Sequence, residues 1–310
     1  MSKSTISTFE LFAMFPDESS ARIYLERNLW PKGTTCPTCA GQDRITTRKR
    51  EGFYRCNKCQ LDFTIRTGTI FERSHIPLHK WVYGMYLLVT ARKGISSMQL
   101  AKEIGVTQKT AWFMLQRLRE ACMSGSGKDD RFAGLIEIDE TFVGGKEANK
   151  HEHKKLKAGR GAVGKAIVLG LRERSSGRVR GMVIEGTDAR TLHNAVHANV
   201  KPGSMIHTDE ALGYQGLDGL WFNHQSVNHG AGEYAKGEIN TNSIESVWAL
   251  LKRGIYGTWH HVSPKHLGRY VDEVSFRLNA GNVAEHTLAR LDSFIQGVDG
   301  KRLTYARLIA

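Results

Sequence analysis

The chain has 310 residues, 40% of them hydrophobic, which is enough for roughly two folded domains of ordinary size. Its formal charge of +13 favours a polyanionic partner such as nucleic acid, although solubility alone would also explain a basic chain. No stretch approaches about 18 uncharged apolar residues, and no apolar run with a small-residue cleavage site begins the chain. The sequence therefore predicts a cytoplasmic protein that neither spans a membrane nor is secreted.

Residues 1–33 predict a helical lead-in. Residues 8–15 are apolar and aromatic, and the capping residue Asp17 then begins a short helix. Trp30-Pro31 ends this helix before the first cysteine.

Residues 34–70 predict a zinc ribbon. Four of the five cysteines form two C-x-x-C pairs separated by sixteen residues: Cys36, Cys39, Cys56 and Cys59. In a chain without a signal peptide, two such pairs at this spacing indicate tetrahedral zinc rather than disulfides. A redox C-x-x-C is the alternative, but it normally occurs singly between a strand and a helix. Since four thiolates leave no free coordination position, the zinc is expected to be structural.

The predicted ribbon has a basic surface. Its cations are Arg44, Arg48, Lys49, Arg50, Arg55 and Lys58. Cations in this number suit contact with phosphates, while a ribbon that binds only protein remains an alternative.

Residues 76–123 predict a helix-turn-helix. After a helix over 78–92, a short helix starts at Ser96 and ends at Gly105, and another starts at Thr107. A small residue between the helices, a glycine in the turn and a polar, basic start to the second helix are typical of this motif. Gln108, Lys109 and Thr110 are then predicted to face the major groove of DNA, although other helical hairpins share the pattern. Cys122 is expected only to pack.

A polar, glycine-rich break at 124–130 separates this part from a predicted α/β domain at 131–285, with residues 286–310 as a C-terminal tail. The expected elements are strands at 135–143, 165–172, 178–185, 204–209 and 222–228, and helices at 190–199, 242–253 and 264–279. Three strands, a helix, two strands and closing helices predict a mixed sheet. The P-loop-like residues 159–166 lack the hydroxyl that Mg²⁺ needs and run into a strand, which argues against a nucleotide site.

The helix at 242–253 has a buried face and an exposed one. Its apolar residues recur at helical spacing: Ile244, Val247, Trp248 and Leu251. Asn242 or Ser243 is expected to cap its start. Glu245 and Lys252 are seven positions apart, so they project from one side about two turns from each other.

Three acids in this domain suit divalent metals. Asp139 lies in the middle of the first strand, Asp209 ends a later strand, and Glu245 lies on the helix. A charge within an apolar strand is costly unless it has a purpose. Carboxylates from two strands and a helix can hold a pair of Mg²⁺ or Mn²⁺ ions that act on a phosphodiester. The alternative is three unrelated surface or capping acids.

Nearly the whole chain resembles the DDE-type bacterial insertion-sequence transposases that carry an N-terminal zinc ribbon and helix-turn-helix. The resemblance rests on W-P-x-G-x-x-C-P-x-C at 30–39, I-D-E-T-F-V-G-G at 138–145, H-T-D-E at 207–210, N-S-I-E-S-V-W-x-L-L-K-R-G at 242–254, and the following His260-His261-Val262-Ser263 segment.

The resemblance implies an RNase H-like catalytic domain in which Asp139, Asp209 and Glu245 bind two metals. It also implies that Lys252 contacts DNA near the scissile phosphate. The neighbouring Arg253 is a further candidate for binding DNA. Because neighbouring residues on a strand point to opposite faces, Glu140 should point away from the metals if Asp139 faces them.

The expected activity is metal-dependent cleavage at the ends of an insertion sequence and transfer of the 3′-hydroxyl to target DNA. Its partners would be the terminal inverted repeats, target DNA and further copies of the chain, which places the protein at the nucleoid. A non-transposing nuclease of the same fold would not need about 120 residues of sequence-reading domain. A DNA-binding regulator without catalysis would be expected to have a broken acid set, and here the set is intact.

Overall fold

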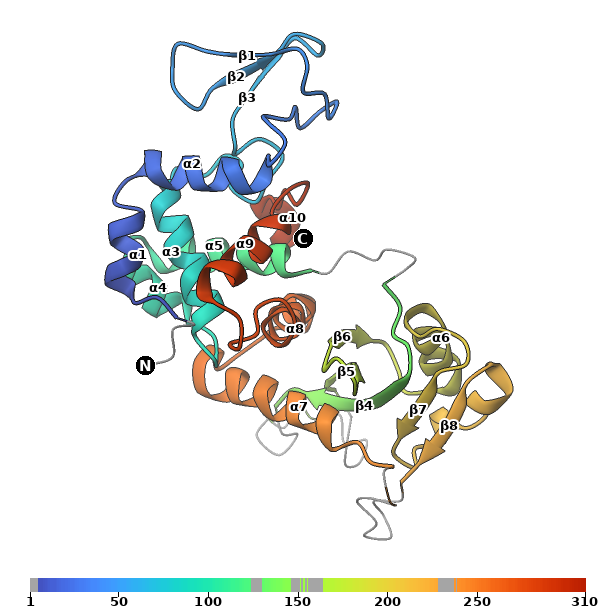
Figure 1. Cartoon of the computed structure of the whole chain (residues 1–310). Helices are drawn as coiled ribbons and strands as arrows, with labels where there is room; N and C mark the ends of the chain where they lie inside the picture. Colours follow the sequence, from blue (N-terminus) through green and yellow to red (C-terminus); the bar gives the residue numbers. More distant parts are fainter. Residues whose placement is uncertain are drawn as a thin grey trace. The chain divides into compact units, whose positions relative to one another are not determined.

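The computed structural model describes residues 5–123, 130–145, 151, 153, 155, 164–227, 237 and 239–310 (Figure 1). The chain forms two compact units, one of Met1–Met123 with Ala280–Ala310 and one of Ser124–Asn279. The chain therefore leaves the first unit once and returns to it at its C-terminal end. None of the described helices is long and apolar enough to cross a membrane.

A small antiparallel sheet forms the ribbon of the first unit. Its strands, in sheet order, are β1 (Ile45–Thr47), β2 (Tyr54–Cys56) and β3 (Leu61–Phe63). The buried side chains of Cys36, Cys56 and Phe63 form its core, and the rings of Trp30 and Tyr54 pack against them. So small a core has little apolar area to bury, so the ribbon needs another source of stability.

Helices make up the rest of the first unit. They are α1 (Thr8–Met14), α2 (Glu18–Leu29), α3 (Leu78–Thr90), α4 (Ser97–Ile104), α5 (Gln108–Cys122), α9 (Thr287–Gln296) and α10 (Tyr305–Ile309). α9 packs on α2, α3 and α5. The buried Arg290 of α9 donates a hydrogen bond to the carbonyl of Val89 (2.5 Å), and Tyr24 donates one to Asp292 (2.6 Å). The sequence suggested only a tail at 286–310, whereas these residues form helices that complete the core of the first unit.

A three-residue turn joins α4 to α5. Ser96 caps the start of α4, Gly105 ends it with φ of 66°, and Thr107 caps the start of α5. A positive φ is most easily adopted by glycine, so Gly105 suits this turn. The predicted pair of capped helices is present with these boundaries.

The second unit is built on a five-stranded mixed sheet of order β6-β5-β4-β7-β8. The strands are β4 (Leu135–Val143), β5 (Ala166–Glu173), β6 (Val179–Ile184), β7 (Met205–Thr208) and β8 (Asn223–Ser226). β4 pairs in parallel with β7 and antiparallel with β5, and β8 is parallel to β7. This confirms the predicted α/β class, a mixed sheet with flanking helices.

Two hydrophobic cores lie against this sheet. One includes Ile136 and Ile138 of β4 with residues of α6 (Ala189–Asn199). The other includes Val143 of β4 with residues of α7 (Asn242–Gly254) and α8 (Pro264–Leu278). Because side chains alternate along a strand, the odd-numbered residues of β4 face α7 and the even-numbered ones face α6. Asp139 is therefore on the α7 side.

Candidate metal sites and nucleic-acid surface

The four ribbon cysteines form a compact cluster. Their sulfur atoms all lie within 4.8 Å of one another, and Cys39 Sγ and Cys56 Sγ are 3.8 Å apart. Zn–S bonds of about 2.3 Å in a tetrahedron separate sulfurs by roughly 3.8 Å, so the cluster fits a zinc ion. The backbone N–H of Cys59 donates to Cys56 Sγ (3.4 Å) and lowers the pKa of that thiol to about 7. Hydrogen bonding with Cys39 raises the pKa of Cys59 to about 12, so the spacing of the four sulfur atoms, and not their pKa values, supports the predicted structural zinc.

Asp139 and Asp209 lie side by side because their strands, β4 and β7, are parallel neighbours in the sheet. The ladder between β4 and β7 pairs Glu137 with His207. Two residues further along each strand are Asp139, in the middle of β4, and Asp209, directly after β7. Adjacent strands are about 4.8 Å apart, so the two aspartates are neighbours across the sheet.

Helix α7 carries Glu245 and packs on the face of the sheet that carries Asp139. Its apolar residues are buried as predicted, while Glu245, Lys252 and Arg253 are exposed. Trp248 Nε1 on the buried face donates a hydrogen bond to Asp139 Oδ2 (2.8 Å). The helix therefore holds the side chain of Asp139 directly.

Gly170 makes this contact possible. It pairs with Asp139 across the β4–β5 ladder and so lies on the same face of the sheet. A Cβ atom at this position would come within 2.5 Å of the Trp248 ring and 2.9 Å of Ile244. Because side chains essentially never approach so closely, only glycine leaves room for α7 here.

The electrostatics of the site favour a cation. Burial raises the pKa of Asp139 to about 6, the Trp248 hydrogen bond opposes this rise, and the charges of Asp209 and Glu245 add to it. Among the described residues, only the four cysteines form a group of three or more metal-binding side chains within 4.8 Å, so the three carboxylates are spaced more widely. Hard oxygen donors whose negative charges raise the pKa of Asp139 suit Mg²⁺ or Mn²⁺, which would relieve this repulsion.

Glu140 faces the other side of β4, as predicted from strand alternation. Its Oε2 accepts a hydrogen bond from the fully buried Tyr214 (2.6 Å), a residue of the α6-side core. Burial raises the pKa of Glu140 to about 7; the Tyr214 hydrogen bond opposes this rise, and the charges of Asp209 and Asp139 reinforce it. Asp209 therefore interacts with acids on both faces of the strand.

Glu137 is a site residue that the sequence did not single out. Its side chain is fully buried, and its Oε2 accepts hydrogen bonds from the backbone N–H groups of Ser243 (2.9 Å) and Ile244 (3.0 Å). Its Oε1 accepts two more from Arg174, at 2.9 and 2.7 Å. These bonds fasten the first turn of α7 to the strand that carries Asp139.

The predicted capping of α7 by Asn242 or Ser243 is wrong. Thr241 occupies the N-cap position and no side chain there bonds the free N–H groups. A carboxylate from β4 satisfies them instead and also complements the positive end of the helix dipole. The only sequence signal for this role of Glu137 was that it and Asp139 are two acids at alternate positions, on one face of a strand.

The predicted DNA-reading residues lie in the first turn of α5. Gln108 and Lys109 are exposed and Thr110 is half-buried. Gln108 donates to Ser97 Oγ (2.8 Å), and the Lys109 ammonium lies 5.0 Å from the centroid of the Tyr305 ring. Since α5 is buried from Met114 to Cys122, only its first part can contact a ligand, and α10 lies beside that part.

Two known families match this chain. Residues 16–62 match the transposase zinc-ribbon domain, and residues 131–279 match the ISXO2-like transposase domain. Together they cover more than half of the chain. The fold and the cysteine cluster thus define a zinc-ribbon protein with a transposase domain. The chain carries an N-terminal transposase zinc-ribbon domain followed by an ISXO2-like transposase domain.

Individual relatives agree with this assignment. An uncharacterized protein in transposable element ISH50 of Halobacterium salinarum is 28% identical over 250 residues, which are 77% of this chain and 83% of the relative. An uncharacterized transposase-like protein of Haemophilus influenzae is 26% identical over 106 residues, 34% of this chain and 85% of the relative.

One solved structure is also similar in part: the cryo-EM structure of the simian T-cell lymphotropic virus intasome in complex with PP2A regulatory subunit B56 gamma. Its sequence is 12% identical to this chain, and the TM-score is 0.29. The matched region covers 60% of this chain and 66% of the chain in the solved structure.

The cysteine cluster predicts that the ribbon depends on zinc. Cys36→Ser, or removal of zinc by a chelator, should unfold the ribbon because its core is too small to be stable alone. Metal analysis should find one zinc per chain, and circular dichroism with limited proteolysis should report the unfolding. Cys122→Ser, outside the cluster, is the control and should keep its zinc. A metal-free protein with an unchanged fold would contradict the prediction.

Glu137→Ala should loosen the start of α7. It leaves the N–H groups of Ser243 and Ile244 without their acceptor, whereas the half-buried Arg174 keeps its hydrogen bonds to Asn240; each unsatisfied buried N–H costs about 1–3 kcal/mol. Hydrogen exchange of these two amides should accelerate strongly. Glu185→Ala, at an exposed acid after β6, should change little. Equal exchange in both variants would refute the role of Glu137.

The raised pKa of Asp139 predicts a pH-dependent gain in stability for Asp139→Asn. The folded wild type binds the extra proton between about pH 4 and 6, so its stability falls as the pH rises through this window and stays lower above it. Without added divalent metal, the Asn variant should be more stable by about 2 kcal/mol at pH 7.5 and nearly equal at pH 4. Urea unfolding at both pH values measures this, and a less stable variant at pH 7.5 would contradict it.

Proposed function

We propose that this protein is a DNA transposase that cleaves DNA at the ends of its insertion sequence and transfers the resulting 3′-hydroxyl to target DNA. The observation that carries the proposal is the arrangement of Asp139, Asp209 and Glu245 within a transposase family domain. Asp139 and Asp209 come from adjacent parallel strands, and Glu245 comes from the helix that bonds Asp139 through Trp248.

The reaction consists of two phosphoryl transfers. Water first attacks the phosphodiester at the end of the element, which breaks the bond to the 3′-oxygen and releases a 3′-hydroxyl. That hydroxyl then attacks a phosphodiester of the target, so one P–O bond forms as another breaks. Two divalent cations, Mg²⁺ or Mn²⁺, held by the three carboxylates would activate the attacking oxygen and stabilise the leaving one.

The chain contributes position and charge. The Trp248 hydrogen bond fixes one oxygen of Asp139, and Glu137 fixes the start of the helix that carries Glu245. The exposed Lys252 and Arg253 lie further along α7, where we infer that they contact the DNA backbone. No side chain needs to form a covalent intermediate with DNA.

The first unit would bind the terminal inverted repeats. The exposed Gln108 and Lys109, with Thr110, begin the second helix of the α4–α5 pair, the position from which such helices contact bases in the major groove. The ribbon would add contacts to the backbone, although its Arg48 and Arg55 both pair with Asp62 in the free protein. Because transfer joins two ends to one target, we infer that two or more copies assemble on DNA.

Removing any one of the three acids should abolish cleavage. Asp139→Asn, Asp209→Asn and Glu245→Gln should each lower Mg²⁺-dependent cleavage of a DNA end by at least about 100-fold, since each removes a carboxylate that would hold the metals acting on the reacting phosphate. Gel-shift binding of the same DNA should persist. The matched control is Glu185→Gln, at an exposed acid of the same unit, which should cleave normally.

Full cleavage by any of the three variants would refute the site assignment. Cleavage by the wild type without joining to target would indicate a nuclease, and binding without cleavage would indicate a regulator.

A further inference from the structure

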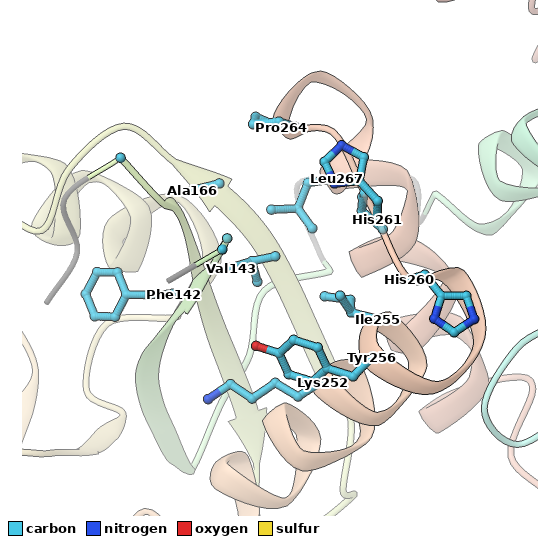
Figure 2. A pocket seen from close by; sticks show the side chains of 14 residues that line it. Phe142, Val143, Ala166, Lys252, Ile255, Tyr256, His260, His261, Pro264 and Leu267 are labelled. Atoms are coloured by element: carbon cyan, nitrogen blue, oxygen red, sulfur yellow. The ribbon is translucent and has the colours of Figure 1, made fainter. Parts of the chain in front are cut away.

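A cavity of about 310 Å³ lies beyond the proposed site, at the end of α7 (Figure 2). Apolar side chains line much of it, among them Val143, Ala166, Ile255, Val262 and Leu267. Its volume is at the lower end of the roughly 300–1,000 Å³ of small-molecule pockets, so it suits one small planar group rather than a duplex.

The same face of α7 runs from the proposed site to this cavity. Glu245 and Lys252 are seven positions apart, a spacing that returns to one side of α7, and Tyr256 lies in the turn directly after that helix. All three are exposed, and both Lys252 and Tyr256 line the cavity. Figure 2 shows these two side chains extending from the helix toward the strand that carries Val143. Eleven residues span about 16 Å, a distance of about five base steps in stacked DNA.

The backbone departs from regular helix where Tyr256 lies. Residues Ile255–Trp259 form a π-helical turn, and His260 ends it with φ of 59°. Wider turns of this kind and positive φ at residues other than glycine are both uncommon and occur often at functional sites. The result is a tyrosine that is 67% exposed beside an apolar cavity.

The charge around the cavity complements a polyanion. Lys252 lies on its lining with His260 and His261, and none of the described residues that line it is acidic. An exposed aromatic ring, an apolar floor and a cation together match what a single nucleotide offers, which is a flat base with a phosphate beside it. A protein segment or a free small ligand would not explain the continuity with the face that carries Glu245.

We propose that this cavity, which we call the Tyr256 pocket, receives one unstacked base of the DNA strand being processed. The base stacks on the ring of Tyr256, and Lys252 contacts a flanking phosphate. This proposal rests on the proposed function. Holding one base out of the stack would fix the strand in register, so that the scissile phosphate stays at the acids.

The test uses the full-length protein and DNA ends that carry 2-aminopurine at one position at a time, within about five steps of the cleavage site. The wild type should raise the fluorescence at one position, because this probe brightens when it leaves the stack. Tyr256→Ala should lose that signal and weaken binding of the DNA end by about 5- to 150-fold, whereas Tyr256→Phe should keep both. Val183→Ala, at an exposed apolar residue on β6, is a further control and should match the wild type.

An abasic nucleotide at the responsive position separates stacking from a loss of fold. It removes the base that must leave the stack, so Tyr256→Ala and the wild type should bind this DNA nearly equally. If the wild type cleaves DNA ends but no position responds and Tyr256→Ala binds normally, the pocket proposal is wrong and the proposed function stands. If the wild type neither binds nor cleaves DNA ends, both are wrong.

Discussion

The buried carboxylate of Glu137 is the contact on which the second unit depends most. It joins β4 to the first turn of α7 through two backbone N–H groups and holds Arg174 with its other oxygen. A buried charge is tolerable only when it is fully bonded, and here one carboxylate satisfies a helix end that has no cap of its own. The position of α7 on the sheet follows from this bond.

Once α7 is fixed, the proposed site follows from local geometry. Gly170 lets the helix approach closely enough for Trp248 to bond Asp139, and the register of β4 with β7 brings Asp209 alongside. The side of the helix next to Trp248 carries the exposed Glu245 and Lys252, three residues before and four residues after it. The burial that positions Asp139 also raises its pKa, so the same packing that stabilises the fold makes the site attract cations.

Much of the fold and of the proposed site could be predicted, because the sequence patterns that indicate them involve residues close together in the chain. Cysteine spacing predicted the cluster, capping residues predicted α4 and α5, and an acid within an apolar strand pointed to Asp139. The role of Glu137 could not be predicted, because its partner Ser243 is 106 positions away and the bond uses only backbone atoms of the helix. The packing of α9 on the first unit depends likewise on contacts such as Arg290 with Val89, 201 positions apart. The π-helical turn that exposes Tyr256 has no recognisable sequence signal.

The most direct test of the account is a strand-transfer assay with the purified protein. A labelled DNA end with the inverted repeat that flanks the gene, cut in advance to expose its 3′-hydroxyl, would be incubated with plasmid and Mg²⁺. The account predicts that the label becomes covalently joined to the plasmid, and only when divalent metal is present. Joining that persists without metal, or no joining by a protein that binds the end tightly, would contradict it.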